Sequence, residues 1–439
     1  MSEKNIKWLY DELPKLVEQS ILTDDDAAKV KSYYGIIDEK NWLKSALAIF
    51  GTLGAILIGA GIILLLAKNW PNLSRAARTV ISLAPMIVGQ ILVAWVLYKE
   101  KQSDAWREGV SSFAMISIGA AIALIGQTYH IPGDMGSFLF SWMILSIPLV
   151  YLMKASVPGI FYLIAITAWA GTVQSEGGNA LLFWLLAALM IPHIWGNFKK
   201  DLESNRSLFL SWAVSILFCI AIGITLEKVL PGLWIVIYSS YFAVLYLVGS
   251  LYFERSSGFW EQPFKVVGLG GILVLTVMCT YEWPWKSIGW SYYRNRPGFI
   301  EWAGIADYVL AAALFAVMLY LLYRFIRKSR NNVLSFGFVP VLSAIGYLIV
   351  SVTNDNFWML IIYNVYLFAL GLETVVRGIK NQKMGITNGG MLILSMMIVL
   401  RFFDADWGFA TRGIAFISIG IGFLVSNYIL WKKREGGTL

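Results

Sequence analysis

From about residue 44 the chain is a succession of apolar runs separated by short polar segments. As helices rising about 1.5 Å per residue, these runs are long enough to cross roughly 30 Å of membrane hydrocarbon. The pattern therefore predicts an all-α, polytopic integral membrane protein with about 14 transmembrane helices. The predicted spans are 44–67, 76–98, 109–130, 137–153, 156–173, 180–196, 207–226, 232–253, 264–282, 302–324, 333–353, 356–376, 384–402 and 411–431. Three of the shorter spans contain a proline and are candidates for kinked or re-entrant segments: Pro148, Pro158 and Pro192.

The N-terminal segment before these runs is charged and amphipathic. One apolar stripe follows residues 3–19, and Thr23, followed by three aspartates, predicts the N-cap of a second helix that ends near Tyr34. The stripe is too small for an independent core, so this hairpin should pack on the membrane domain, on a second copy or on a protein partner. The predicted parts are a cytoplasmic helical hairpin (1–43), a transmembrane domain (44–431) and a basic cytoplasmic tail (432–439).

Composition and charge agree with this pattern. The chain is 58% hydrophobic and 14% charged, whereas soluble domains are about 25% charged. With both termini cytoplasmic, the cytoplasmic side holds 26 of the 35 basic residues and the outer side holds 9, as the positive-inside rule requires. The net charge of +8 follows from this topology, so nucleic acid is not expected as a partner. Cys219 and Cys279 lie inside apolar runs as packing residues, and no metal site or cofactor is predicted.

Residues 126–134 collect hydrogen-bonding side chains at the end of an apolar span. Pro132 disfavours helical backbone at the preceding residue, so the helix should end near His130. One interpretation is a polar cap on a membrane helix, and the other is a ligand site, because Gln127 and His130 lie three apart on one helix face. An enzyme would use His130 as general acid or base, but no nucleophile is evident and no catalytic residue is assigned. The candidate ligand-binding residues of this stretch are Gln127, Tyr129, His130 and Asp134.

The outer side also carries two further candidate groups. Arg401 and Asp404 are three apart and can pair on a helix, while a metal site is not predicted there. The outer loop 282–301 is rich in aromatic and basic residues. This loop can form an interfacial belt, or a platform for a sugar, an aromatic solute or a phosphorylated lipid headgroup. Its candidate ligand-binding residues are Trp290, Arg294 and Arg296.

Four stretches together resemble a bacterial membrane-protein family called domain of unknown function 2157. They are the hydrophilic hairpin ending in Leu22-Thr23, residues 126–134, Arg401-Phe402-Phe403-Asp404 and Arg412-Gly413-Ile414-Ala415-Phe416. The resemblance covers residues 5–170 most clearly, with the C-terminal motif as a second anchor. It implies a protein of the bacterial cytoplasmic membrane and carries over no catalytic role. It draws attention to the positions that match its motifs, which are Gln127, Tyr129, His130, Asp134, Arg401 and Asp404.

The expected function is transporter-like or flippase-like binding of a small polar solute or lipid headgroup at an outward-facing pocket. An alternative is a non-catalytic scaffold or accessory subunit of an envelope complex, and a third is an outer-face enzyme that uses His130. The expected partners are membrane lipids, a small polar solute or phosphorylated lipid, and a protein or second copy that contacts residues 1–43.

Overall fold

The computed structural model describes residues 3–19, 21–34, 68, 70–100, 103–226, 233–253, 258–286, 288, 302–328, 335–404 and separate positions between 414 and 428. The described residues form helices and turns, and no strand occurs among them. Ten of the helices are long and apolar enough to cross a membrane. The prediction of an all-helical, multi-pass membrane protein is therefore confirmed. The predicted span 44–67 and most of the span 411–431 lie outside the described residues.

The chain divides into two compact units, Met1–Val80 and Ile81–Leu439. In the first unit, α1 (Glu3–Glu18) contacts α2 (Asp24–Tyr34), and the Tyr10 hydroxyl donates to the Lys31 carbonyl at 3.1 Å. The predicted N-cap is confirmed, because the Asp26 backbone N–H donates to Thr23 Oγ1 at 3.2 Å and the Thr23 hydroxyl donates to the Asp26 carboxylate at 2.6 Å. This capping box holds the pKa of Asp26 below its usual value.

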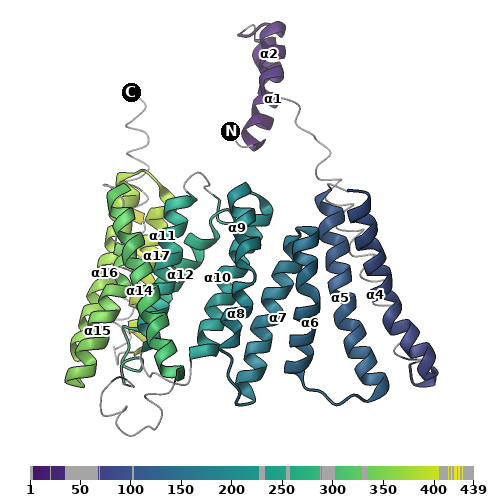
Figure 1. Cartoon of the computed structure of the whole chain (residues 1–439). Coiled ribbons are helices and arrows are strands. Elements are labelled where there is room, and N and C mark those ends of the chain that lie inside the picture. The colour runs from purple at the N-terminus through teal and green to yellow at the C-terminus, as the bar shows by residue number, and fades with distance from the viewer. Residues whose placement is uncertain are drawn as a thin grey trace. The chain divides into compact units, whose positions relative to one another are not determined.

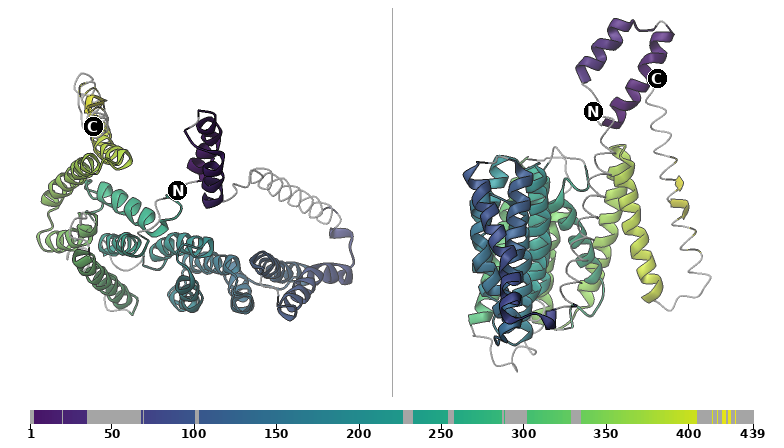
Figure 2. Two further views of the ribbon diagram at one scale, coloured as in Figure 1. Left: turned by 90° about the horizontal axis from the view of Figure 1, so that it is seen from above. Right: turned by 90° about the vertical axis from the view of Figure 1, so that its right-hand side faces the viewer.

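The remaining helices are mostly long and apolar, and α4 to α7 alternate in direction (Figure 1). The left view of Figure 2 shows most of them end-on. In chain order they are η1 (Trp70–Asn72), α4 (Arg75–Tyr98), α5 (Asp104–Tyr129), α6 (Met135–Met153), α7 (Ser156–Ser175), α8 (Leu182–Ala188), α9 (Ile191–Lys200), α10 (Asn205–Leu226), α11 (Leu233–Tyr252), α12 (Pro263–Met278), α14 (Trp302–Lys328), η2 (Ser335–Phe338), α15 (Val339–Thr353), α16 (Phe357–Lys380) and α17 (Met384–Asp404).

The second unit contains two main hydrophobic cores. One lies among helices α4–α10 and includes the fully buried Met143 and Phe183, and the other lies among α11–α17 and includes Tyr363. A third cluster around Tyr241 joins α10 to α11, α12 and α14. Large apolar side chains such as Leu348 point away from these cores and are exposed. Such an apolar exterior would aggregate in water but matches the hydrocarbon of a bilayer.

Two predicted spans differ from the structure. The span predicted at 180–196 is broken into α8 and α9, because Pro192 lies in the first turn of α9 and its ring would clash with the carbonyl four residues earlier, at Ala188, where α8 ends. The span predicted at 264–282 is the shorter helix α12, which ends at Met278. The residues after it turn back, and the Trp285 indole donates to the Cys279 carbonyl at 2.9 Å.

A single carboxylate ties three helix ends together. Glu108, near the start of α5, accepts from the backbone N–H groups of Ser156 at 2.9 Å and Val157 at 2.8 Å, in the first turn of α7. The same carboxylate pairs at 3.1 Å with Nε of Arg206, near the start of α10, whose Nη2 lies 3.0 Å from the Asp104 carboxylate. The N-terminal ends of α5, α7 and α10 therefore lie at one face of the unit.

Candidate functional site

The stretch 126–134 forms the connection between α5 and α6. Helix α5 ends at Tyr129, as the position of Pro132 predicts. His130 adopts the left-handed conformation with φ 52°, and its backbone N–H donates to the Gly126 carbonyl. The next N–H, of Ile131, donates to the same carbonyl at 2.9 Å. The backbone of this stretch thus caps the C-terminal end of α5, because it supplies donors to the Gly126 carbonyl in the last turn.

Thr128 is buried and its hydroxyl donates to the Leu124 carbonyl at 2.7 Å, while the candidate side chains of the stretch either cap a helix or are exposed. Asp134 is the N-cap of α6, and its carboxylate accepts from the Ser137 N–H at 2.7 Å and from the Ser137 hydroxyl at 2.9 Å. These two bonds hold the pKa of Asp134 below its usual value. Gln127, Tyr129 and His130 are exposed. Within the described part of the chain, no hydrogen bond joins any two of Gln127, His130 and Asp134.

Arg401 lies on α17 and contacts the turn that follows α12. Its Nη2 donates to the Thr280 carbonyl at 2.7 Å, and its guanidinium lies over the Tyr281 ring, 4.6 Å from the ring centre. The side-chain amide of Asn364, on α16, donates to the same Thr280 carbonyl at 3.4 Å. The other candidates fall outside what the structure describes, namely the side chain of Asp404 and the residues Trp290, Arg294 and Arg296.

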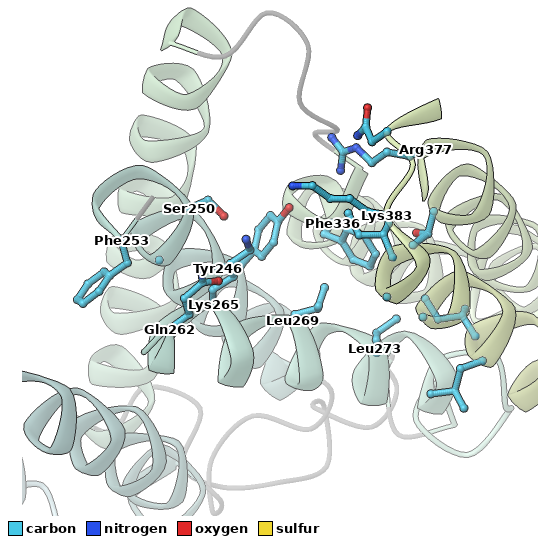
Figure 3. Close-up of a pocket in the computed structure, with 18 of the residues that line it drawn as sticks. Tyr246, Ser250, Phe253, Gln262, Lys265, Leu269, Leu273, Phe336, Arg377 and Lys383 are labelled. Carbon is cyan, nitrogen blue, oxygen red and sulfur yellow. The ribbon is translucent and has the colours of Figure 1, made fainter. Parts of the chain in front are cut away.

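A pocket that the sequence did not indicate lies between the helical hairpins α11–α12 and α16–α17 (Figure 3). Its volume is about 840 Å³, which is within the range of sites for small organic ligands. The lining comes from the C-terminal ends of α11, α14 and α16, from η2, and from the N-terminal ends of α12 and α17. None of the described candidate residues discussed above lines it. The pocket therefore lies apart from the described candidate residues that the sequence indicated.

Three cations surround the mouth of this pocket. Lys265 comes from the first turn of α12, Arg377 from the last turn of α16, and Lys383 from the connection between α16 and α17. No Asp or Glu is among the lining residues that the structure describes. Nη2 of Arg377 is buried without a hydrogen-bond partner. Like charges held together at a partly buried site favour an anion as a counterion.

The deeper wall of the pocket is apolar. Lys265, Leu269 and Leu273 follow one another at intervals of four along α12, so they form one stripe on the helix surface. Figure 3 shows Leu269 and Leu273 along the same helix, beyond Lys265. Ile386 and Ile393 of α17 line the opposite side. The pocket is therefore charged at the helix ends and apolar toward the middle of the spans.

Close helix contacts hold each hairpin together. A methyl group placed on Gly268 of α12 would lie 2.6 Å from the Phe242 carbonyl of α11, which is closer than side-chain atoms approach. A methyl group on Gly390 of α17 would lie 2.9 Å from the Gly371 carbonyl of α16. Small residues at such points let helix backbones approach closely in membranes. Each wall of the pocket is consequently a tightly packed pair of helices.

The sequence gave no signal for this pocket. Lys265 is the second residue of the predicted span 264–282, so it falls at a span end and is one of the 26 basic residues assigned to the cytoplasmic side. Arg377 and Lys383 follow the predicted span 356–376. Basic residues at the cytoplasmic ends of spans are ordinary, so none of the three residues stood out.

The fold and the site define a multi-pass helical membrane protein with a basic, amphipathic pocket at one end of its C-terminal helices. Residues 14–159 match the model of a family described as predicted membrane protein (DUF2157). The resemblance stated from the motifs is thereby confirmed over that part of the chain. No curated protein and no solved structure matches the chain.

Proposed function

We propose that this chain is a multi-pass protein of a bacterial cytoplasmic membrane that binds an anionic solute or lipid headgroup in the pocket between α11–α12 and α16–α17. Binding there would be the first step of transporter-like or flippase-like movement. The observation that carries the proposal is the convergence of Lys265, Arg377 and Lys383 on a pocket whose described lining contains no carboxylate. A bound anion would neutralise these cations and would supply a hydrogen-bond acceptor for the buried Arg377 Nη2.

The charge distribution supports an orientation for this pocket. Lys and Arg collect on the cytoplasmic side of membrane proteins, and the predicted topology assigns 26 of the 35 basic residues to the side that holds Arg377 and Lys383. The pocket would then open toward the cytoplasm, on the opposite side from His130. The ten candidate spans, the broken crossing α8–α9, the short helix α12 and the predicted spans 44–67 and 411–431 would make fourteen crossings. Both termini would be cytoplasmic.

The packing of the hairpins supports movement of a ligand. The pocket lies between α11–α12 and α16–α17, and each pair is held internally by close helix contacts such as those at Gly268 and Gly390. Two rigid pairs around a site can rock against each other and change access to it, as helical repeats do in alternating-access transporters.

Residues 1–43 are proposed to contact a partner protein or a second copy of the chain.

Binding is tested with the full chain purified in detergent and three anions: inorganic phosphate, glycerol 3-phosphate and phosphatidic acid. The double variant Arg377→Gln/Lys383→Gln should weaken binding of at least one probe by tenfold or more. Lys380→Gln is the matched control, because Lys380 lies on the same last turn of α16 but does not line the pocket. If no probe binds, or if the double variant binds every probe as the wild type does, the proposal is wrong.

Movement is tested separately in liposomes that contain the chain and a fluorescent phosphatidic acid. Chemical quenching from outside measures how much probe reaches the outer leaflet. The wild type should accelerate this exchange at least several-fold over liposomes containing the double variant. Binding without exchange would remove the flippase interpretation for this probe and would leave a binding subunit of the scaffold class.

A further inference from the structure

We infer that the ligand of this pocket is a lipid with a terminal phosphate group. Its phosphate would meet Lys265, Arg377 and Lys383, and its hydrocarbon chain would follow Leu269 and Leu273. This inference rests on the proposed function and narrows it to a substrate class.

The charge at the mouth suits a terminal phosphate. A phosphate monoester carries about −1.5 to −2 charges at neutral pH, with three acceptor oxygens, whereas a phosphodiester headgroup carries one negative charge. Three cations from two helical hairpins surround the mouth, and the described lining holds no carboxylate. Glu373, one turn before Arg377 on α16, is not among the lining residues. A ligand with close to two negative charges therefore balances this set better than a phosphodiester does.

The hydrogen-bond donors of the pocket support the same headgroup. Arg377 Nη2 is buried without a hydrogen-bond partner. Figure 3 shows the Tyr246 hydroxyl and the Lys383 side chain on facing sides of the pocket. An unpaired buried donor costs free energy that a bound acceptor recovers. The several oxygens of one phosphate can accept from donors on both hairpins at once.

The apolar wall indicates a hydrocarbon chain rather than a water-soluble anion. Lys265 and Leu273 are eight residues apart on α12, so the stripe between them extends about 12 Å along the helix axis. One leaflet contributes about half of the roughly 30 Å hydrocarbon core. The pocket thus changes from charged to apolar over about the depth of one leaflet. Leu392, a lining residue of α17, is 66% exposed, which gives a lipid chain an apolar side on which to enter.

The headgroup is tested with the full chain in phosphatidylcholine nanodiscs, by titration with lipids that share the same oleoyl chains. Phosphatidic acid should bind at least tenfold more tightly than phosphatidylglycerol, and Arg377→Gln/Lys383→Gln should reduce the difference to less than threefold. Lys380→Gln should leave it unchanged. Equal affinity of the wild type for the two lipids would overturn the assignment of a terminal phosphate.

The position of the lipid hydrocarbon chain is tested with Leu273→Trp, whose larger side chain would occupy the apolar part of the pocket. Val274→Trp is the matched control. Val274 is the next residue on α12, is 57% exposed and does not line the pocket. Leu273→Trp should weaken phosphatidic acid binding at least tenfold, Val274→Trp less than twofold, and both variants should keep the wild-type elution volume and thermal midpoint. Wild-type affinity in Leu273→Trp would overturn the placement of the lipid hydrocarbon chain along Leu269 and Leu273.

A water-soluble probe separates the two proposals. Glycerol 3-phosphate carries the same phosphate without a hydrocarbon chain, and it should bind the wild type at least 100-fold more weakly than phosphatidic acid. If it binds as tightly as phosphatidic acid, the lipid inference is wrong while the proposed anion site stands. If neither of these probes binds, the lipid inference is wrong, and if inorganic phosphate also fails to bind, the proposed function is wrong as well.

Discussion

Arg401 on α17 donates from Nη2 to the backbone carbonyl of Thr280 at 2.7 Å, just beyond the end of α12. Thr280 lies two residues beyond the last residue of α12, in the turns that follow this helix. The guanidinium pairs the Thr280 carbonyl by charge and by hydrogen bonding, and its plane also lies over the Tyr281 ring. Arg401 therefore fixes the turn after α12 to α17. The pocket-lining Lys265 lies at the other end of the same helix.

We expect Arg401→Gln to destabilise the protein by about 1.5 to 3 kcal/mol, the usual contribution of a hydrogen bond to a charged group. Arg401→Lys should recover part of this, because it keeps the charge but loses the planar contact with Tyr281. Thermal unfolding in detergent measures both variants. A variant with an unchanged thermal midpoint but weakened phosphate binding would assign Arg401 to ligand binding instead.

Glu108 should contribute more to the free energy of unfolding than Asp104, which contacts the same arginine. Glu108→Gln removes the charge that holds Arg206 and the first turn of α7, and we expect a loss of about 2 kcal/mol. Asp104→Asn is the control, because its side chain is 72% exposed although it contacts the same arginine, and exposed pairs contribute about 0 to 1 kcal/mol. Equal destabilisation by the two variants in denaturant unfolding would contradict this assignment.

The contact between α11 and α12 allows a test within one helix. Gly268→Ala would place a methyl group 2.6 Å from the Phe242 carbonyl, whereas Gly270→Ala has no neighbour within 4 Å. We expect Gly268→Ala to cost about 1 to 3 kcal/mol, as overpacking does, and Gly270→Ala to be neutral or slightly stabilising. Thermal midpoints give the comparison, and equal midpoints would mean that the two helices separate without cost.

The capping role of Asp134 predicts local effects. Asp134→Ala should accelerate amide hydrogen exchange at Ser137 and its neighbours in α6, while Asp134→Asn, which retains a capping oxygen, should exchange nearly as the wild type does. Because the folded pKa is lowered, the cap stabilises α6 above the ordinary carboxyl pKa of 3.8 and is lost as pH falls through the lower folded pKa. The difference from Asp134→Ala should therefore be full at pH 6 and vanish at strongly acidic pH.

The exchange experiment also distinguishes the two interpretations of residues 126–134. A pure cap predicts that Asp134→Ala changes α6 locally and leaves phosphatidic acid binding unchanged. A ligand site predicts that binding falls with Asp134→Ala, with His130→Gln, or with both. Unchanged exchange at Ser137 in Asp134→Ala would show that the carboxylate does not cap α6 in the membrane.

Sequence patterns predicted the helices and helix ends that are determined by residues within the same segment of the chain. Apolar runs gave the helices from α4 to α17, Pro132 predicted the end of α5, and Thr23 predicted the cap of α2. The interruption between α8 and α9 follows from Pro192, which the sequence marked as a possible kink. The end of α12 was not predicted. The turn that follows it is held by Arg401 and Asn364, which donate to the Thr280 carbonyl from helices far along the chain.

The sequence by itself determined that this chain spans a membrane many times, because the length and apolarity of each run decide its partition into hydrocarbon without reference to any other run. Only the tertiary structure decided which basic residues meet. Lys265 and Arg377 lie on different hairpins, and no spacing rule relates them. Their convergence depends on how α11–α12 packs against α16–α17, including the contact between α12 and α16. A site built from helix ends distant in sequence therefore becomes visible only when the helices are packed.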